Sequence, residues 1–413
     1  MSRCAILHAA ELHLDAPFAG VGRTPAAVAA ALRDASLGAW SALVDAALAH
    51  RVDAVLLAGG WCGGLEHGVR AQARLRDGIA RLAAHGVRVV LAAGAGDPGE
   101  RLALADGWPE GVVVAAGGGA ATLVLERDGA RLVTIHAAGI GADERAEDAL
   151  RRLAVASGPG PHVGLLAAAP VGGDAGAGLL IEALRSLSYD YWALGGAATF
   201  SVHRAGDPWV VTPGTPQARR LAAGGDGVHG AVLLEFEGDA VARVGFEPLD
   251  RVRAALVRVD DAPDVAAARR RLGEAAEALR GAHAERVLIL EAAVGGRSGA
   301  AQALRQPAAR AGLLAALRRD AERFDPPLWW AAVRPPPAPA LAAAADDLAG
   351  EVARRRAVLA ADAERSVRFL QQRFEPLRGA WTAMLEAREA EALLDEAAAL
   401  AVDALGDAAD GGA

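Results

Sequence analysis

The chain has 413 residues, with 51 acidic and 43 basic side chains and a formal net charge of −8. At roughly 100–200 residues per domain, this length predicts two or three domains with a sizeable core. The composition excludes collagen-like, disulfide-rich and disordered proteins. Hydrophobic residues make up 53% of the chain. No stretch of about 18 residues lacks charges or Gly and Pro, so we expect no transmembrane helix.

The cysteines, the basic residues and the start of the chain bear on cellular location and partners. Cys4 and Cys62 can form at most one bridge, which fits a reducing compartment and excludes a Cys-rich zinc module. The apolar run before Glu11 is too short for a signal-peptide core. Every basic residue is Arg, and the acidic balance argues mildly against autonomous, high-affinity binding to DNA. We therefore expect a cytoplasmic protein.

Strand-like and helix-like segments alternate over the first 250 residues, which predicts an α/β layered fold. In chain order we expect helix 24–51, strand 52–58, helix 66–85, strand 87–94, strands 121–126 and 130–137, strand 162–167, helix 179–187, strand 189–194, strand 210–212 and strands 231–237 and 240–246. The two closely spaced strand pairs are each joined by a turn that contains glycine, which is typical of hairpins. The sheets are therefore expected to be mixed rather than purely parallel.

The pattern restarts near residue 250 with a smaller unit. It consists of strand 254–259, helix 265–279, strand 286–291 and helix 312–323, with Trp329-Trp330 expected in its core. A proline-rich run over 334–339 predicts a stiff linker. Beyond it, residues 341–413 contain 14 acidic residues against 8 Arg and have a helical composition. We therefore expect three parts, namely 1–250, 251–335 and 336–413.

Six short blocks carry the residues from which chemistry can be argued, and most follow predicted strands. They are HAAELHLD from His8, AGGWC from Ala58, GAGDP from Gly94, GLLA from Gly164, DYWALGGAA from Asp190 and TPGTPQ from Thr212. Because the carboxyl ends of parallel strands meet at one edge of a sheet, side chains in such blocks converge.

In order and spacing, these blocks resemble the metallophosphoesterase superfamily. The specific resemblance is to SbcD-like and YhaO-like DNA-repair exonucleases, whose blocks run HAADLHLD, AGDxFD, GNHDP, GLLH, DYWALGHIH and YPGNPQ. It covers about residues 1–250 and implies a four-layer α/β/β/α, calcineurin-like sandwich, with a small α+β capping domain over 251–335 and a helical tail. It also implies a site for two divalent metals such as Mn²⁺, which would orient and deprotonate a water for attack on a phosphodiester.

The sequence departs from this family at most metal-ligand positions. Glu11 replaces the first Asp, while His13 is retained. The position of the Asp that bridges both metals is Gly60, and the catalytic His position is Gly96. The remaining lost ligand positions are Ala95, Ala167, Gly196 and Ala198. Since losing even a supporting partner weakens metal binding about 10–100-fold, we expect no bound metal, no cofactor and no catalytic residue.

Glu11 and His13 also have interpretations that involve no metal. His13 is then a hydrogen-bonded histidine at a strand end, and Glu11 is a salt-bridge partner of Arg3 or Arg204. A substitute metal site is a further alternative, and it would use His13, Cys62 and His67.

The expected function follows from the resemblance and from the lost ligands. We expect a catalytically degenerate, SbcD-like nuclease subunit that acts as a scaffold or holds DNA ends. The alternatives are an active metal-dependent phosphoesterase or exonuclease with rearranged ligands, and a binder of small molecules in the vacated cleft.

The resemblance also implies that the tail docks on the coiled coil of an SMC-like ATPase, with DNA reached through that complex and no membrane contact. An apolar stripe in the tail contains Phe369, Leu370 and Phe374, which we expect to be the partner-binding residues. Packing of the stripe within the chain is the alternative. A homodimer is left open.

Overall fold

The structure is a computed structural model. It describes residues 3–14, 16, 18–61, 68–97, 107–169, 181–221, 227–295, 298–334 and 348–360. The chain divides into two compact units. One comprises Met1–Leu256, Ala276–Glu291 and Arg318–Ala332, and the other comprises Val257–Ala275, Ala292–Leu317 and Val333–Ala413.

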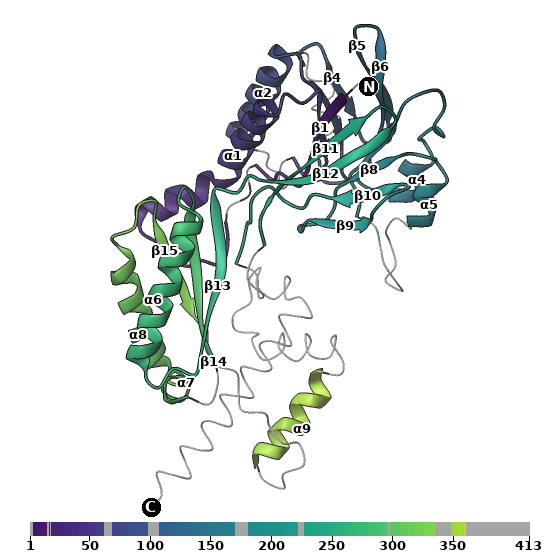
Figure 1. Ribbon diagram of the computed structural model, residues 1–413. Coiled ribbons are helices and arrows are strands. Elements are labelled where there is room, and N and C mark those ends of the chain that lie inside the picture. Colours follow the sequence, from purple (N-terminus) through teal and green to yellow (C-terminus); the bar gives the residue numbers. More distant parts are fainter. Residues whose placement is uncertain are drawn as a thin grey trace, which may run out of the picture. The chain divides into compact units, whose positions relative to one another are not determined.

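The first sheet holds the N-terminal parallel strands. Its order is β12-β11-β1-β2-β3-β4 (Figure 1). The strands are β1 (Arg3–Ala10), β2 (Ala54–Ala58), β3 (Arg88–Ala92), β4 (Val112–Ala115), β11 (Gly230–Glu237) and β12 (Ala240–Pro248). Strands β1 to β4 are mutually parallel, whereas β11 runs antiparallel to β1 and β12. The loops that follow β1, β2 and β3 therefore leave the sheet at one edge.

The second sheet has the order β5-β6-β7-β8-β10-β9. Its strands are β5 (Ala120–Arg127), β6 (Ala130–Ala138), β7 (His162–Leu166), β8 (Tyr191–Leu194), β9 (Ser201–Arg204) and β10 (Trp209–Thr212). Strands β6, β7, β8 and β10 are parallel, and the hairpin partners β5 and β9 are antiparallel. Both predicted hairpins, β5–β6 and β11–β12, are confirmed.

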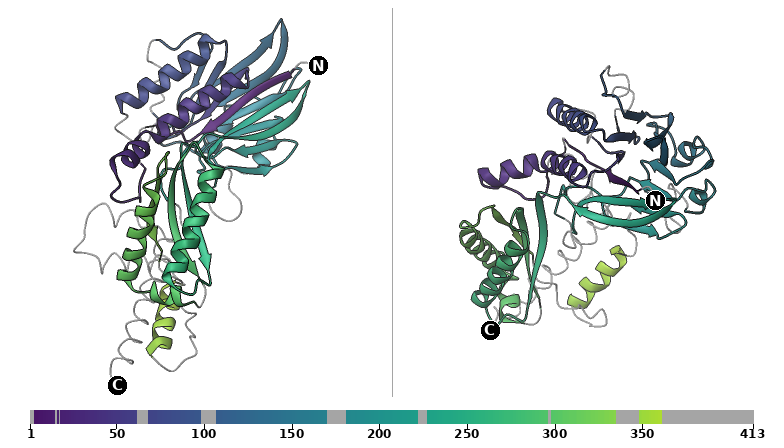
Figure 2. Two further views of the ribbon diagram at one scale, coloured as in Figure 1. Left: turned by 60° about the vertical axis from the view of Figure 1, so that its left-hand side comes forward. Right: turned by 45° about the horizontal axis from the view of Figure 1, so that its top comes forward.

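The two sheets and the helices on their outer faces form four layers. One apolar cluster contains residues of both sheets, such as Ile6, Leu56, Ile135 and Leu165, and lies between them. On the outer face of the first sheet, α1 (Ala26–Ala49) and α2 (Val69–Ala84) pack in a second cluster (Figure 2). Helices α4 (Ala146–Leu150) and α5 (Ile181–Arg185) pack on the second sheet. The expected α/β/β/α sandwich is confirmed.

A glycine inside α2 shows how closely the two helices pack. A Cβ atom on Gly78 would lie 2.4 Å from the indole Nε1 of Trp40. That indole is 1% exposed and donates to the carbonyl of Arg74 at 2.8 Å. Glycine costs about 1 kcal/mol in a helix interior, and here it leaves room for a large buried ring.

A three-stranded sheet of order β13-β14-β15 follows. In chain order the elements are β13 (Val252–Asp260), α6 (Val265–Ala282), β14 (Val287–Gly295), α7 (Gly299–Ala303), α8 (Pro307–Ala321) and β15 (Leu328–Val333). The sequence predicted β13, α6, β14 and α8, but it placed the start of α8 at residue 312. Helix α8 begins earlier because Pro307 suits the first helical position, where no backbone N–H is needed.

Of the C-terminal tail, the structure describes α9 (Leu348–Ala360). Phe369, Leu370 and Phe374 lie outside the described residues. Within the described part of the chain, no helix is both long enough and apolar enough to span a membrane.

Candidate functional site

The loops that follow β1 and β2 are joined by backbone hydrogen bonds. The N–H of Glu11 donates to the carbonyl of Gly59 at 3.0 Å, and the N–H of His13 donates to the carbonyl of Gly60 at 2.7 Å. Glu11 and His13 both adopt positive φ angles, of 53° and 41°. This rarely occupied backbone region is found mainly in turns and at functional sites.

Glu11 and His13 form a hydrogen-bonded pair. Glu11 Oε2 lies 2.7 Å from His13 Nε2, and Glu11 Oε1 accepts from the N–H of Gly196 at 3.1 Å. Burial acts to raise the pKa of Glu11. The hydrogen bond and charge of His13, the Gly196 N–H and the charge of Arg219 outweigh burial and hold this pKa below its usual value. The carboxylate is thus ionised, and each of its oxygens has a protein partner.

Gly60, which the sequence resemblance aligns with a bridging Asp, has no room for a side chain. Its φ angle is 65°, and a Cβ atom there would lie 2.7 Å from the Cα atom of Glu11 and 2.8 Å from its Oε2 atom. Glu11 therefore occupies the space that a side chain at residue 60 would need. An Asp at this position would require both a strained backbone and a displaced Glu11.

Asp97 holds the neighbouring loops together. Its Oδ2 accepts from the N–H groups of Gly60 at 2.8 Å and Gly94 at 2.9 Å, and its Oδ1 accepts from the N–H of Trp61 at 2.8 Å. Burial raises the pKa of Asp97 and outweighs the opposing effect of these three hydrogen bonds. With its oxygens directed at backbone donors, this carboxylate stabilises the loops that follow β2 and β3.

The other predicted positions lie on the same set of loops. A Cβ atom on Gly59 would lie 2.5 Å from the Cβ of Ala167, and one on Gly94 would lie 3.4 Å from it. Ala95 follows Gly94 directly, and a Cβ atom on Gly96 would have nothing within 4 Å.

Gly196 and Ala198 belong to the loop that follows β8. Gly196 contacts Glu11 through its N–H group, whereas the carbonyl of Ala198 accepts from the N–H of Thr215 at 3.1 Å. The structure thus links Glu11, Gly60 and Gly196 directly, and it links Ala198 to the loop after β10 instead.

Arg219, which was not predicted as a site residue, lies on the loop after β10. Its side chain is half-buried, and electrostatic attraction links its guanidinium to Glu11. Burial lowers the pKa of Arg219, the charge of Glu11 raises it and the charge of Arg220 lowers it further. The guanidinium has no hydrogen bond or ion pair with any described residue. The adjacent pair Arg219-Arg220 was the available sequence signal.

The proposed salt bridge from Glu11 to Arg3 or Arg204 is wrong. Arg3 pairs with Glu235 across the β1–β11 ladder. Arg204 donates to the backbone carbonyl of Asp207 at 3.0 Å. The partner of Glu11 is His13, because the turn after β1 directs both side chains to the same point.

The donor side chains among the described residues do not fit two divalent metals. In the part of the chain that the structure describes, no group of three or more His, Cys, Asp and Glu side chains is arranged to hold a metal ion. Two carboxylates lie near Gly60. Glu11 is hydrogen-bonded to His13, and Asp97 accepts hydrogen bonds from three backbone N–H groups. Cys62 and His67, the other members of the substitute site, lie outside the described residues.

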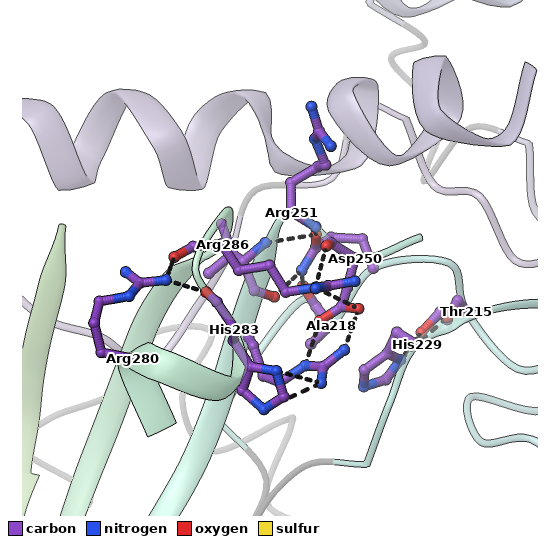
Figure 3. Close-up of polar contacts among 11 residues, drawn as sticks. Thr215, Ala218, His229, Asp250, Arg251, Arg280, His283 and Arg286 are labelled. Atoms are coloured by element: carbon purple, nitrogen blue, oxygen red, sulfur yellow. Dashed lines mark hydrogen bonds and ion pairs between the residues drawn. The ribbon is translucent and has the colours of Figure 1, made fainter. Parts of the chain in front are cut away.

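A second polar cluster surrounds Asp250, where β12 leads into β13 (Figure 3). The Asp250 carboxylate is buried and accepts two hydrogen bonds from Arg253, at 2.6 and 2.7 Å, and one from Arg286 at 3.3 Å. Gln217, from the sixth block, donates to the carbonyl of Val252 at 2.6 Å and accepts from the N–H of Arg251 at 2.8 Å. These bonds fix the loop that carries Arg219.

Comparison with known proteins gives one similar curated sequence and several similar structures. No profile of a known protein family matches the chain. The metallophosphoesterase YhaO of Bacillus subtilis, itself described as uncharacterised, is 29% identical over 225 residues. That region covers 53% of this chain and 55% of the relative, so the match spans about half the length of each.

Two crystal structures are similar at low identity. TT1561 of Thermus thermophilus has a TM-score of 0.32 and 13% identity, over 52% of this chain and 90% of that one. A Vps29 double mutant from Entamoeba histolytica has a TM-score of 0.28 and 17% identity. This similarity covers 60% of this chain and 98% of that one. Together, the sandwich topology and the sequence similarity to YhaO support a place for this chain in the metallophosphoesterase superfamily.

Proposed function

We propose that this chain is a catalytically degenerate, SbcD-like nuclease subunit. In this role it is a scaffold, or a holder of DNA ends, within a cytoplasmic complex with an SMC-like ATPase. The observation that supports loss of catalysis is the Glu11–His13 pair beside Gly60. The side chain of Glu11 fills the space that a ligand at residue 60 would need, and both of its oxygens have protein partners.

The physical argument concerns the number of donors. Catalytic metal centres normally use about three protein ligands per ion, and two-metal sites share a bridging group between the ions. Glu11 and His13 supply two donors, and Gly60 supplies none where the bridge would stand. A two-metal centre that activates water is therefore not supported by these residues.

Metal content and nuclease activity test this proposal. The full chain, purified without chelators, should contain well under one equivalent of Mn, Fe or Zn by elemental analysis, and it should not degrade linear DNA in Mn²⁺. A Glu11→Ala/His13→Ala variant serves as the matched control. Stoichiometric metal, or nuclease activity that disappears in this control, would show that the proposal is wrong.

An active phosphoesterase with rearranged ligands is the second candidate, and the similarity to the metallophosphoesterase YhaO favours it. This candidate requires donors from parts of the chain beyond the described residues, such as Cys62 and His67. Cys62→Ala and His67→Ala variants should then lose metal together with activity. If the wild-type chain carries no metal, the second candidate is excluded.

The partner assignment rests on the C-terminal tail. Residues 341–413 carry 14 acidic residues against 8 Arg, a net charge of −6 that repels DNA phosphates but suits a basic or apolar groove on a protein. Replacing Phe369, Leu370 and Phe374 by Ala should abolish co-purification with an SMC-like ATPase and leave the thermal transition unchanged. Val358→Ala, an exposed position on α9, is the control. A lowered transition temperature would indicate that the stripe packs inside the chain.

A further inference from the structure

His283 follows the last residue of α6 and faces a cation rather than an acid (Figure 3). Its Nδ1 and Nε2 atoms both lie 3.4 Å from Nη1 of Arg253. A guanidinium carries only N–H donors, whereas a neutral imidazole has one ring nitrogen that can accept a hydrogen bond. The contact therefore needs a neutral ring, because a proton would remove the acceptor and place two cations side by side.

The charged groups around the ring come from four segments. Asp250 lies between β12 and β13, Arg253 on β13, Arg286 before β14 and Arg280 on α6. The Asp250 carboxylate already accepts from Arg253 and Arg286. Burial, then the charge of Arg253 and that of Arg286, lower the pKa of His283 and outweigh the opposing effect of Asp250. Three guanidinium groups and one carboxylate thus surround a ring that resists protonation.

The backbone around His283 is tied to the same groups. Its carbonyl accepts from the N–H of Arg286 at 3.1 Å and from the guanidinium of Arg280. The N–H of Val287, the first residue of β14, donates to the carbonyl of Arg251 at 3.0 Å. A displaced ring therefore disturbs the turn over residues 283–286 and the place where β14 meets the connector over residues 249–251.

We propose that His283 is a proton-sensitive latch between the end of α6 and the connector from β12 to β13. The latch is closed when the neutral ring accepts from Arg253. A ring released into water titrates near pH 6.5, so it binds a proton more readily than the ring beside Arg253 does. Lowering the pH through 6.5 therefore favours the open turn. This device goes beyond the proposed function and does not depend on the loss of catalysis.

The size of the effect follows from the titration of the released ring. A group with a pKa of about 6.5 is roughly 24% protonated at pH 7 and roughly 91% protonated at pH 5.5. If the closed ring stays neutral, the equilibrium constant for opening rises about eightfold between these pH values. The rise is smaller where the closed ring also binds protons, so we expect a rise of between about twofold and eightfold.

Hydrogen exchange of the full chain at pH 7.0 and 5.5 measures this local opening, once the rates are corrected for intrinsic exchange. The reporters are the amides of His283, Arg286 and Val287, each of which donates to a backbone carbonyl. The end of α2 is the internal control. His85 also follows its helix, and its Nδ1 lies 2.8 Å from the carbonyl oxygen of Arg81, a contact that a protonated ring keeps. Opening at His85 should not increase in acid.

Two variants separate protonation from loss of the ring. His283→Gln offers Arg253 an amide oxygen that does not titrate, so opening should change by less than twofold between the two pH values. His283→Ala offers no acceptor, so the turn should be as open at pH 7.0 as the wild-type turn is at pH 5.5. NMR of ¹³C-labelled histidines, with His283 assigned from the Gln variant, should show a pKa below 6.5.

Each outcome decides for or against the latch. A local rise in the wild type that is absent in His283→Gln supports it. A wild-type rise below twofold, an equal rise in His283→Gln, or titration of His283 at or above pH 6.5 overturns it. A rise shared by the strands of the two larger sheets would mean general acid unfolding and would also overturn it. None of these results bears on metal content or nuclease activity, which test the proposed function separately.

Discussion

Two buried histidines should make the β-sandwich sensitive to mild acid. His136 is 6% exposed, and its Nε2 lies 3.0 Å from Nδ1 of His162. Burial and the charge of His162 lower the pKa of His136 from 6.5 to about 4. His8 is fully buried beside Tyr191, and burial lowers its pKa to about 3. Both rings are therefore neutral in the folded protein at pH 5.

The direction of the effect follows from proton binding. An unfolded histidine titrates near pH 6.5, so between about pH 6.5 and 4 the unfolded chain binds a proton that folded His136 does not. The contribution of His136 to the free energy of unfolding is complete above this window and falls as the pH is lowered through it. From pH 7 to pH 5 the loss is about 2 kcal/mol for His136. His8 adds a similar loss of about 2 kcal/mol.

Urea unfolding followed by tryptophan fluorescence at pH 7, 6 and 5 measures this loss. The wild-type free energy of unfolding should fall by about 2 kcal/mol more than that of His136→Gln between pH 7 and pH 5. His85→Gln, at an exposed position after α2, should behave as the wild type does. The comparison uses the pH-dependent difference, so the fixed cost of each substitution cancels. An equal fall in His136→Gln and wild type would refute the reasoning.

Four further substitutions test the loops of the site by urea unfolding. Gly60→Ala should lower the free energy of unfolding by about 2–4 kcal/mol, because the methyl group meets Glu11 at a positive φ angle. Gly96→Ala, with nothing within 4 Å of the new atom, should change it by less than about 0.5 kcal/mol. Asp97→Ala leaves three backbone N–H groups without their acceptor and should cost about 3 kcal/mol. Gln217→Met removes the bonds that hold Arg251 and Val252 and should also cost about 3 kcal/mol, so a loss below about 1 kcal/mol would mean that solvent replaces those bonds.

Elements with a strong periodic or continuous apolar pattern were predicted well. Strand β2 is an uninterrupted apolar run that is buried along its whole length, as expected for a central parallel strand. Helix α2 combines buried Leu75, Ile79 and Leu82 with exposed polar residues, which is the usual amphipathic spacing. Both elements were found within a few residues of their limits.

Short elements were missed because their stability comes from neighbouring strands. Strands β4 and β9 have four residues each, too few for a period to be recognised. Strand β9 contains exposed Val202 and His203 beside Arg204, a pattern that also suits a loop. Antiparallel pairing with β10, which follows four residues later, places it in the sheet. Strand β10 is itself held in the sheet by β8, and this tertiary pairing is not visible in the local pattern of β9.

The sequence by itself determined the layered α/β architecture, the two hairpins and the presence of Gly or Ala at residues 60, 95, 96, 167, 196 and 198, because these depend on local periodicity and on residue identity. Only the tertiary structure decided which side chains and backbone groups surround these positions. The bond from the N–H of Gly196 to Glu11 joins residues 185 positions apart, and the charge of Arg219, on yet another loop, lowers the pKa of Glu11. Such contacts arise where the ends of parallel strands meet, and no local pattern encodes which side chains will face one another there.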